Sequence, residues 1–272
     1  MKLGKKIEST NALSYFDKFE ELVIGDETCI YKALYNNWLE FIENRCSKGY
    51  TFRYVTPFIP EKYADVIFRY IIDLSKLARI KVVFNDLGLL NKCSELIKTY
   101  KIIPVIGRMI THSLCDCQWI GKIITNEDDE IKDVMISSKL THIEKLSFFQ
   151  SKMINEFEIN LYDIDIIKEL YDLGLNLTIY GTDILLSISR ICYSAMWNQK
   201  ELPQCVFDNT CNKKINLQLL KKWTRSSGLQ KLKNIEELNM NQNIYIKGNA
   251  IYQDAPFFDT DLMSKYIYLM IY

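Results

Sequence analysis

The sequence lacks several features that define large classes of proteins. No apolar run approaches the roughly 18 residues that a membrane-spanning helix needs, and the opening MKLGKKIEST has no apolar core of a secretory signal. We therefore expect a cytoplasmic chain without membrane contact. Net charge is also absent, because 34 Lys and Arg residues balance 34 Asp and Glu residues. Proteins that bind nucleic acid by themselves usually carry a basic excess, so nucleic acid is not an expected partner.

Histidine is scarce, which limits the hydrolytic chemistry that the chain can perform. His112 and His142 are the only two, neither lies in a nucleophile signature, and the zinc-protease helix motif does not occur. A catalytic triad is therefore not supported. Internal repeats and low-complexity linkers are missing as well, so we expect residues 1–272 to fold as a single domain.

Alternating strand and helix patterns indicate the fold class. A hydrophobic fraction of 48% with 25% charged residues predicts a sizeable soluble core. Short apolar runs predict strands, and amphipathic helices lie between them, in units of roughly 25 to 30 residues that favour a parallel sheet. The sequence therefore predicts an α/β, TIM-barrel-like fold. The expected strands are residues 20–25, 51–56, 80–84, 102–106, 158–162 and 175–180.

The number of expected strands is too small for a comfortable eight-stranded barrel. We therefore predict an incomplete or decorated barrel, which a partner chain would close. In this interpretation residues 1–15 form a flexible arm and residues 16–211 form the barrel core. Residues 212–272 form a carboxyl-terminal extension with a hairpin around residues 247 and 248 and a final helix at 261–271.

Three of the eight cysteines gather in one stretch after the last predicted barrel strand. Twelve residues separate Cys192 from Cys205, and five separate Cys205 from Cys211. The loops beyond the carboxyl ends of strands are where βα folds carry their chemistry. Thiols in a reducing compartment suggest a metal or an iron-sulfur cluster. The spacing matches no tight zinc pattern, however, and free cysteines are often simply buried hydrophobic residues.

The surrounding sequence resembles the cysteine signature of the collagenase-like peptidase family, peptidase family U-32. The similarity is greatest to its small iron-sulfur members in oxygen-independent ubiquinone hydroxylation, in which a Ser-Ala-Arg-Cys element precedes a second cysteine after twelve residues. Here SRIC ends at Cys192, and Cys205 has the family spacing. Further similar elements are VFNDLG (residues 83–88), IGRM (residues 106–109) and IGDETC, which ends at Cys29.

This resemblance implies a cofactor, a site and a reaction class. Its implied ligands are four cysteines that hold a 4Fe-4S cluster, with zinc as the alternative metal: Cys29, Cys192, Cys205 and Cys211. The implied function is that of a subunit in an oxygen-independent hydroxylation system, acting on a small organic or aromatic acceptor. Relatives of this kind work as pairs of related chains, so a paralogue is the expected heteromeric partner. Differences such as Leu87 in place of the family tryptophan indicate a divergent member.

Three polar residues at predicted strand ends are candidates for the catalytic pocket. Asn85 and Asp86 end one strand, where they would orient a substrate or water, or would cap the next helix. Arg108 follows a glycine at the next strand end and is suited to binding a carboxylate with two parallel hydrogen bonds. An internal salt bridge is an equal alternative for Arg108.

The remaining cysteines have simpler interpretations. Cys115 and Cys117 lie near His112 in an irregular segment, where metal binding is the alternative to two unrelated thiols. Cys93 lies on the apolar face of a predicted helix and is expected in the core. Cys46 is given no role.

Three other functions stay open from the sequence. They are an RNA-base hydroxylation factor, a non-catalytic scaffold subunit and a peptidase. An RNA-modifying relative would need a basic surface leading to its pocket. A scaffold would bind its partner without any cluster, and whether the chain is itself an enzyme is left undecided.

Overall fold

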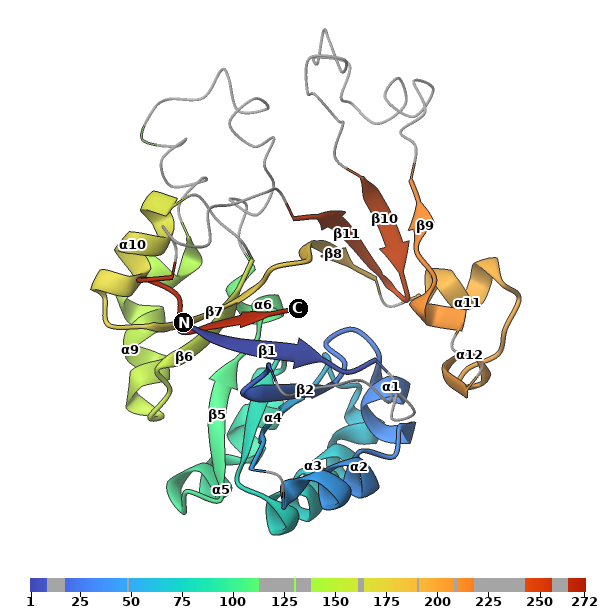
Figure 1. Ribbon diagram of the computed structural model, residues 1–272, viewed down its shortest axis with the longest axis horizontal. Coiled ribbons are helices and arrows are strands. Elements are labelled where there is room, and N and C mark those ends of the chain that lie inside the picture. The colour runs from blue at the N-terminus through green and yellow to red at the C-terminus, as the bar shows by residue number, and fades with distance from the viewer. Residues whose placement is uncertain are drawn as a thin grey trace, which may run out of the picture.

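The computed structural model describes residues 1–8, 18–47, 49–112, 130, 138–160, 164–189, 191–207, 210–217, 243–255 and 264–272. Eight parallel strands in these ranges close into a barrel (Figure 1). Their order around the barrel is β1-β12-β7-β6-β5-β4-β3-β2. The strands are β1 (Lys2–Lys6), β2 (Glu21–Gly25), β3 (Thr51–Val55), β4 (Ile80–Phe84), β5 (Ile102–Ile106), β6 (Glu156–Ile159), β7 (Asn176–Tyr180) and β12 (Leu269–Ile271). This architecture confirms the TIM-barrel-like α/β fold.

Strands β1 and β12 complete the barrel, so the incomplete form of the prediction, with a partner chain closing the barrel, was wrong, and the decorated form was correct. Strand β1 lies in the predicted flexible arm, and β12 lies in the predicted final helix. Strand β1 pairs with β12 on one side and β2 on the other, which stabilises a strand of polar sequence, KLGKK. Three buried residues, LMI, are too few for periodicity to separate a strand from a helix.

Helices and short turns of helix connect the strands. The longest described helix, α3 (Glu61–Leu77), has 17 residues, and no helix in the described ranges has the length and hydropathy needed to cross a bilayer. The other helical elements are α1 (Ile30–Tyr35), α2 (Trp38–Cys46), α4 (Leu87–Lys92), α5 (Ser94–Lys98), α6 (Arg108–Thr111), η2 (Lys139–Thr141), α9 (Ile143–Ser151), α10 (Ile164–Asp172), α11 (Tyr193–Trp197), α12 (Gln204–Phe207) and η3 (Thr210–Asn212).

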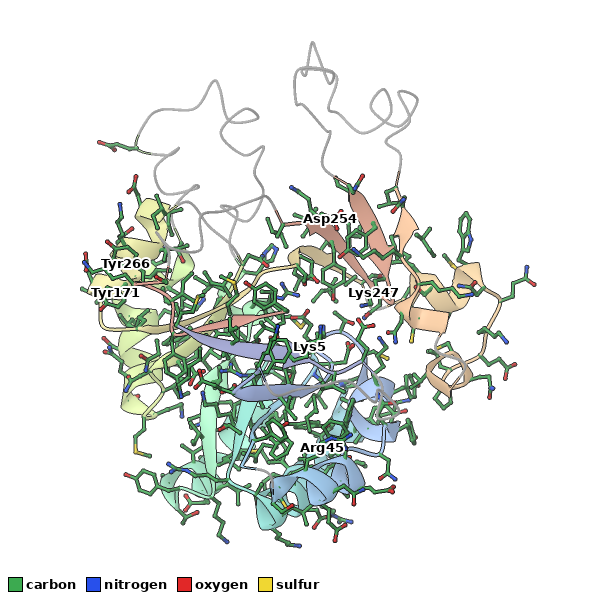
Figure 2. The ribbon with its side chains drawn as sticks, viewed as in Figure 1. Lys5, Arg45, Tyr171, Lys247, Asp254 and Tyr266 are labelled. Atoms are coloured by element: carbon green, nitrogen blue, oxygen red, sulfur yellow. The ribbon has the colours of Figure 1, made fainter. Side chains whose placement is uncertain are left out.

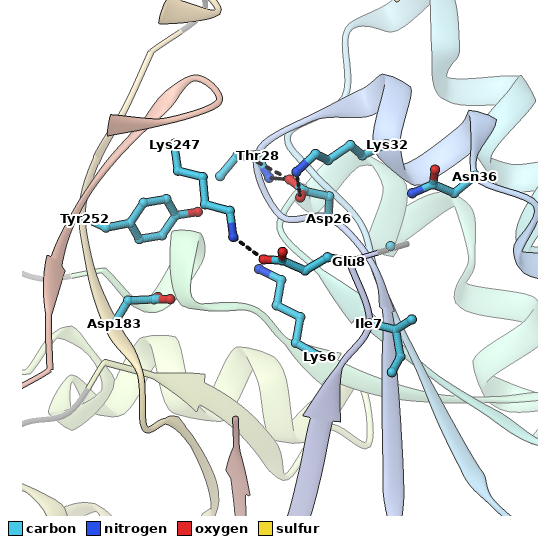
Figure 3. Close-up of a pocket in the computed structure, with 11 residues that line it drawn as sticks. Lys6, Ile7, Glu8, Asp26, Thr28, Lys32, Asn36, Asp183, Lys247 and Tyr252 are labelled. Carbon is cyan, nitrogen blue, oxygen red and sulfur yellow. Dashed lines mark hydrogen bonds and ion pairs between the residues drawn. The ribbon is translucent and has the colours of Figure 1, made fainter. Parts of the chain in front are cut away.

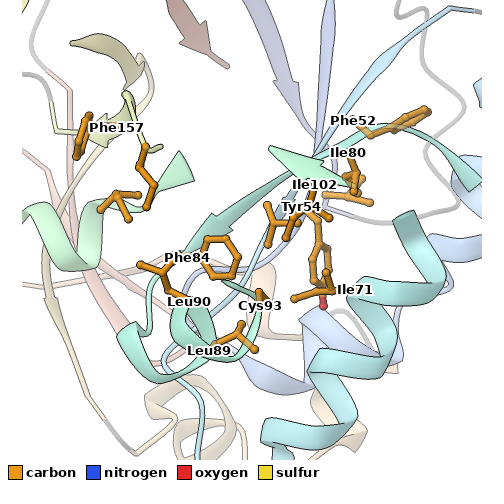
Figure 4. Close-up of a cluster of buried hydrophobic side chains, with 14 of the residues drawn as sticks. Phe52, Tyr54, Ile71, Ile80, Phe84, Leu89, Leu90, Cys93, Ile102 and Phe157 are labelled. Carbon is orange, nitrogen blue, oxygen red and sulfur yellow. The ribbon is translucent and has the colours of Figure 1, made fainter. Parts of the chain in front are cut away.

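The main core lies between the outer face of the barrel and its helices (Figure 4). Strand residues alternate in direction, so Phe52 and Tyr54 of β3 point toward α3 while Arg53 points into the barrel. Helix α3 contributes Ile71 to this interface. On another side, the rings of Tyr171 and Tyr266 meet edge to face 5.4 Å apart and connect α10 to the segment before β12 (Figure 2).

A second, four-stranded antiparallel sheet extends the barrel. Its order is β8-β11-β10-β9, with β8 at Asp183–Ile188, β11 at Ala250–Asp254, β10 at Ile244–Lys247 and β9 at Ile215–Asn216. Strands β10 and β11 confirm the predicted hairpin. Strand β8 follows β7 directly and carries the chain out of the barrel toward α11 (Figure 1). The segment just after the last predicted barrel strand therefore continues as a strand of the second sheet.

The interior of the barrel contains a buried ionic network as well as an apolar layer. Arg53 is fully buried and ion-pairs with three carboxylates, those of Glu21, Glu156 and Glu158. Lys81 adds contacts of 3.0 Å to Glu21 and to Glu156. Such charges are expensive to bury and persist only when each is paired. The network therefore ties β2, β3, β4 and β6 together from inside.

Replacing Arg53 with Met should strongly destabilise the fold, because three buried carboxylates would lose their main counter-ion. The expected loss is about 3 to 5 kcal/mol in the free energy of unfolding at neutral pH, measured by urea denaturation. Lys98→Met is the matched control, since Lys98 pairs with Glu95 on an exposed surface and should cost less than about 1 kcal/mol. Equal effects of the two substitutions would contradict the structural role of Arg53.

Candidate functional site

Polar side chains collect where the barrel strands end at their carboxyl termini. Strand β2 ends at Gly25, whose positive φ of 84° and close approach to the Val55 carbonyl leave no room for a side chain. The sharp turn there brings the next two residues, Asp26 and Glu27, over the barrel mouth, where both are buried. Lysines and carboxylates surround a hollow of about 20 Å³ at this point, the size of a water molecule (Figure 3).

Arg108 is the centre of this mouth, and all its hydrogen-bonding capacity is used internally. Its Nε and Nη2 donate to Glu27 at 2.8 and 2.6 Å, and Nη2 also donates to Asp183 at 2.8 Å. Its Nη1 donates to the Asn160 side chain at 3.3 Å and to the Asp183 carbonyl at 3.0 Å. A guanidinium has five N–H donors, and these contacts occupy all of them. Arg108 therefore forms the internal salt bridge that the sequence left as its alternative.

Asn85 positions the segment that carries Arg108. Its side-chain amide donates to the Thr56 carbonyl at 2.8 Å, and its oxygen accepts from the Met109 amide at 3.1 Å. A Cβ at Gly107 would lie 2.1 Å from the Asn85 oxygen, so the glycine of the IGRM element is required for this contact. Asn85 and Gly107 therefore act together to hold the segment that carries Arg108 in place.

Asp86 caps helix α4, as the sequence allowed. Its carboxylate accepts a hydrogen bond from the Leu89 amide at 2.9 Å and a longer one from the Ile59 amide at 3.4 Å. Its described contacts are therefore with the backbone of its own helix and of the segment after β3. The catalytic roles predicted for Asn85, Asp86 and Arg108 stay predictions.

The structure brings the four predicted cysteine ligands together in one place. Cys29 precedes α1 and Cys192 precedes α11, while Cys205 lies in α12 and Cys211 in η3. All four belong to a single apolar cluster that also includes Ala195. Cys205 and Cys211 are buried, and the other two are partly exposed. Residues far apart along the chain therefore meet as a group of thiols beside the barrel mouth.

The electrostatic surroundings raise the pKa of three of these thiols, those of Cys29, Cys205 and Cys211, and keep them protonated when no metal is bound. Burial, with a further contribution from Asp26, raises the pKa of Cys29 to about 12. Burial and the neighbouring thiols raise the pKa of Cys205 to about 11. Burial also raises the pKa of Cys211, although the nearby ammonium of Lys32 opposes this shift. Metal binding would have to displace these protons.

The remaining cysteines lie elsewhere. Cys93 is fully buried in the main core, as predicted, and Cys46 is exposed at the end of α2. Cys115 and Cys117 lie outside the described residues, as does Arg190 of the SRIC element.

Four thiols are the donor set of iron-sulfur clusters and of some structural zinc sites. Within the described ranges, no three His, Cys, Asp or Glu side chains are placed to share one ion. Zinc draws its ligands to about 2.0 to 2.3 Å from one centre. In a 4Fe-4S cluster the four thiolates bind different irons, so their sulfurs need not converge on a point.

An apolar pocket of about 680 Å³ opens next to the thiols, between the barrel mouth and the second sheet. Cys29 and Cys192 contribute to its wall. Its apolar lining consists of Ile30, Tyr31, Phe58, Ile59, Pro60, Met109, Ile188 and Leu202. Pockets of this size and composition are typical of sites for small organic molecules. A bound molecule there would lie beside two of the four cysteines.

Several residues of the mouth were missed from the sequence. Glu27 lies in the IGDETC element, which was considered only for Cys29, and Asp183 follows β7 by three residues with no motif around it. Lys32 follows Cys29 by one helical turn and looked like an ordinary surface lysine, although it is only 8% exposed. Glu158 was placed in a strand with no sign that it would face the barrel interior.

The barrel and its second sheet define a TIM-barrel-like α/β protein that gathers four thiols beside its mouth. No protein-family model matches the chain, and no curated protein matches it. The solved U32 peptidase Mk0906 is similar over 99% of this chain and 91% of that chain, with 9% identity and a TM-score of 0.47.

Two structures of Xanthomonas albilineans dihydropteroate synthase are also similar. One is a complex with indole-2-carboxylic acid and 6-chloroguanine, with 12% identity and a TM-score of 0.36. The other contains 4-aminobenzoic acid, with 11% identity and a TM-score of 0.37. Each covers 77% of this chain and 81% of the other chain. The fold class is established by the strand pairing of the barrel itself, not by these likenesses.

Glu158 should make the stability depend on pH between about 5 and 8. Its burial and the nearby Glu27 outweigh Arg53 and raise its pKa from 4.5 to about 7. The folded state therefore binds more protons than the unfolded state between these two values, so ionisation of Glu158 reduces stability as pH rises through 7. The shift corresponds to a contribution on the order of 3 kcal/mol.

Glu158→Gln removes this titration while keeping an acceptor for Arg53 and a polar partner for the Tyr180 hydroxyl. The stability difference between wild type and variant should therefore shift in favour of the variant from pH 5 to pH 8. Urea denaturation at several pH values measures it. A difference that stays constant over this range would refute the assignment.

Proposed function

We propose that the chain is an iron-sulfur protein of the U-32 peptidase-like family and acts in oxygen-independent hydroxylation of a small organic or aromatic acceptor. The observation that carries the proposal is the meeting of Cys29, Cys192, Cys205 and Cys211 in one cluster beside an apolar pocket. These four residues would hold a 4Fe-4S cluster, with zinc as the less favoured metal. When bound, the cluster would supply one-electron transfer beside the acceptor.

The chain's own residues would bind and orient the acceptor. The pocket walls contributed by Phe58, Ile59 and Ile188 favour an apolar or aromatic body, because they remove apolar surface from water. Thr28 and Ser189 provide polar groups at the same pocket. The resemblance further implies a related chain as heteromeric partner. The cytoplasmic setting expected from the sequence would keep the thiols reduced and able to bind a metal.

Anaerobically purified protein should contain about four irons and four acid-labile sulfides per chain, measured together with the visible absorption spectrum. Cys192→Ala should lose most of both, since it removes one of four ligands. Cys46→Ala is the matched control, because that thiol is exposed at the end of α2, away from the cluster. Iron-free wild-type protein that folds normally after anaerobic reconstitution would overturn the proposal.

Filling the pocket should block an apolar ligand without disturbing the thiols. Ile188→Trp places a larger ring in the pocket, so the fluorescence titration of anilinonaphthalene sulfonate should show roughly tenfold weaker binding. Tyr100→Trp is the control, since that side chain is 71% exposed outside the pocket. Unchanged binding by Ile188→Trp would exclude this pocket as the apolar site.

A further inference from the structure

Lys32 connects the two chain segments that carry the buried thiols. It lies in α1, one turn after Cys29, and its ammonium donates a hydrogen bond to the side-chain oxygen of Asn212. Asn212 follows Cys211 in η3, and the bonded residues are 180 positions apart along the chain. This hydrogen bond joins the Cys211 segment to the segment that begins at Cys29, in addition to the apolar packing of the cysteine cluster.

The Lys32 ammonium is buried. Its other described partner is Asp26, at 3.5 Å (Figure 3). Asp26 is also committed to its own turn, since its Oδ1 accepts from the Thr28 amide at 2.8 Å, the Thr28 hydroxyl at 2.7 Å and the Cys29 amide at 2.9 Å. A buried ion pair is weak as a source of stability, and an apolar pair of similar volume would serve the fold equally well. A lysine at this position is therefore better explained by its charge.

The positive charge of Lys32 lies close to the thiols of Cys29 and Cys211. Burial opposes protonation of Lys32, but Asp26, Cys211 and Cys29 outweigh it and raise the pKa of the ammonium above its ordinary value. The lysine is therefore cationic throughout the physiological range. Four thiolates and their irons would carry net negative charge, and a neighbouring cation stabilises the more negative, reduced state.

Resting on the proposed function, we infer that Lys32 is a positioning residue for the cysteine site. It holds the Cys211 segment at the barrel mouth through Asn212, and it supplies a positive charge that favours the reduced state of a bound cluster. The first role belongs to the metal-free chain, and the second appears only with metal bound. The two roles can therefore be tested separately.

Hydrogen exchange of the full-length, metal-free protein tests the first role. In Lys32→Met, the peptide that covers α12 and η3 should exchange on the order of tenfold faster than in wild type, because a buried charged hydrogen bond is lost. Lys32→Arg keeps a cationic donor and should restore most of the protection. Wild-type protection in Lys32→Met would overturn this role, whatever the metal content of the protein.

Reduction potentials of the reconstituted proteins test the second role. Lys32→Met should lower the potential, and Lys32→Arg should stay close to wild type. Asp26→Asn keeps the Oδ1 acceptor of its turn but removes a negative charge, so it should raise the potential. Because Asp26→Asn keeps Lys32, its reduction potential still tests the electrostatic role if Lys32→Met binds no iron.

Potentials of Lys32→Met and Asp26→Asn that shift in the same direction, or stay at the wild-type value, would refute the electrostatic role. If wild-type protein takes up no iron, the proposed function and the electrostatic role both fail. The exchange measurement then still decides whether Lys32 holds the Cys211 segment.

Discussion

The ion pairing of Arg53 inside the barrel is the constraint on which the mouth depends. Small barrels usually fill their interior with branched apolar side chains, and here a guanidinium joins carboxylates from β2 and β6. The Glu158 carboxylate also accepts from the Tyr180 hydroxyl at 3.1 Å, and the Tyr180 ring lies 3.9 Å from the Arg108 guanidinium carbon. Tyr180 therefore connects the ionic network around Arg53 to the one around Arg108. Displacement of β3, which carries Arg53, would leave buried carboxylates of β2 and β6 without their main counter-ion.

Arg108 transmits this order to the part of the molecule that carries the thiols. It contacts Glu27 after β2 and Asp183 at the start of β8, so it joins the barrel to the second sheet. Strand β8 leads to α11 and Cys192, while the turn that contains Glu27 leads to Cys29. The pocket wall that contains Cys29 and the wall that contains Cys192 are thus both anchored by the Arg108 guanidinium. All five N–H donors of Arg108 are used within the chain, which is the salt-bridge alternative that the sequence left open.

The sequence predicted those strands that are marked by an apolar run within a short window of residues. Strands β2 to β5 and β7 follow from apolar runs, and Pro104 in β5 did not prevent its pairing. Strands β1 and β12 were missed because they depend on each other, and a long-range pairing leaves no local pattern. The thiols were predicted to meet from their spacing and family resemblance. The roles of Lys32, Asp183 and Glu158 depend on contacts between distant segments, which no window of sequence contains.

The pairing of β1 with β12 also has a consequence for biosynthesis. The two strands lie at opposite ends of the described chain, so the ribosome releases one long before the other exists. Until then the nascent sheet has two open edges, at β1 and at β7, which are surfaces prone to wrong pairing with other chains. Closure is a contact of high sequence separation and is accordingly slow to form. Conditions that delay translation near the carboxyl terminus should therefore favour aggregation, even though the finished barrel leaves no edge exposed.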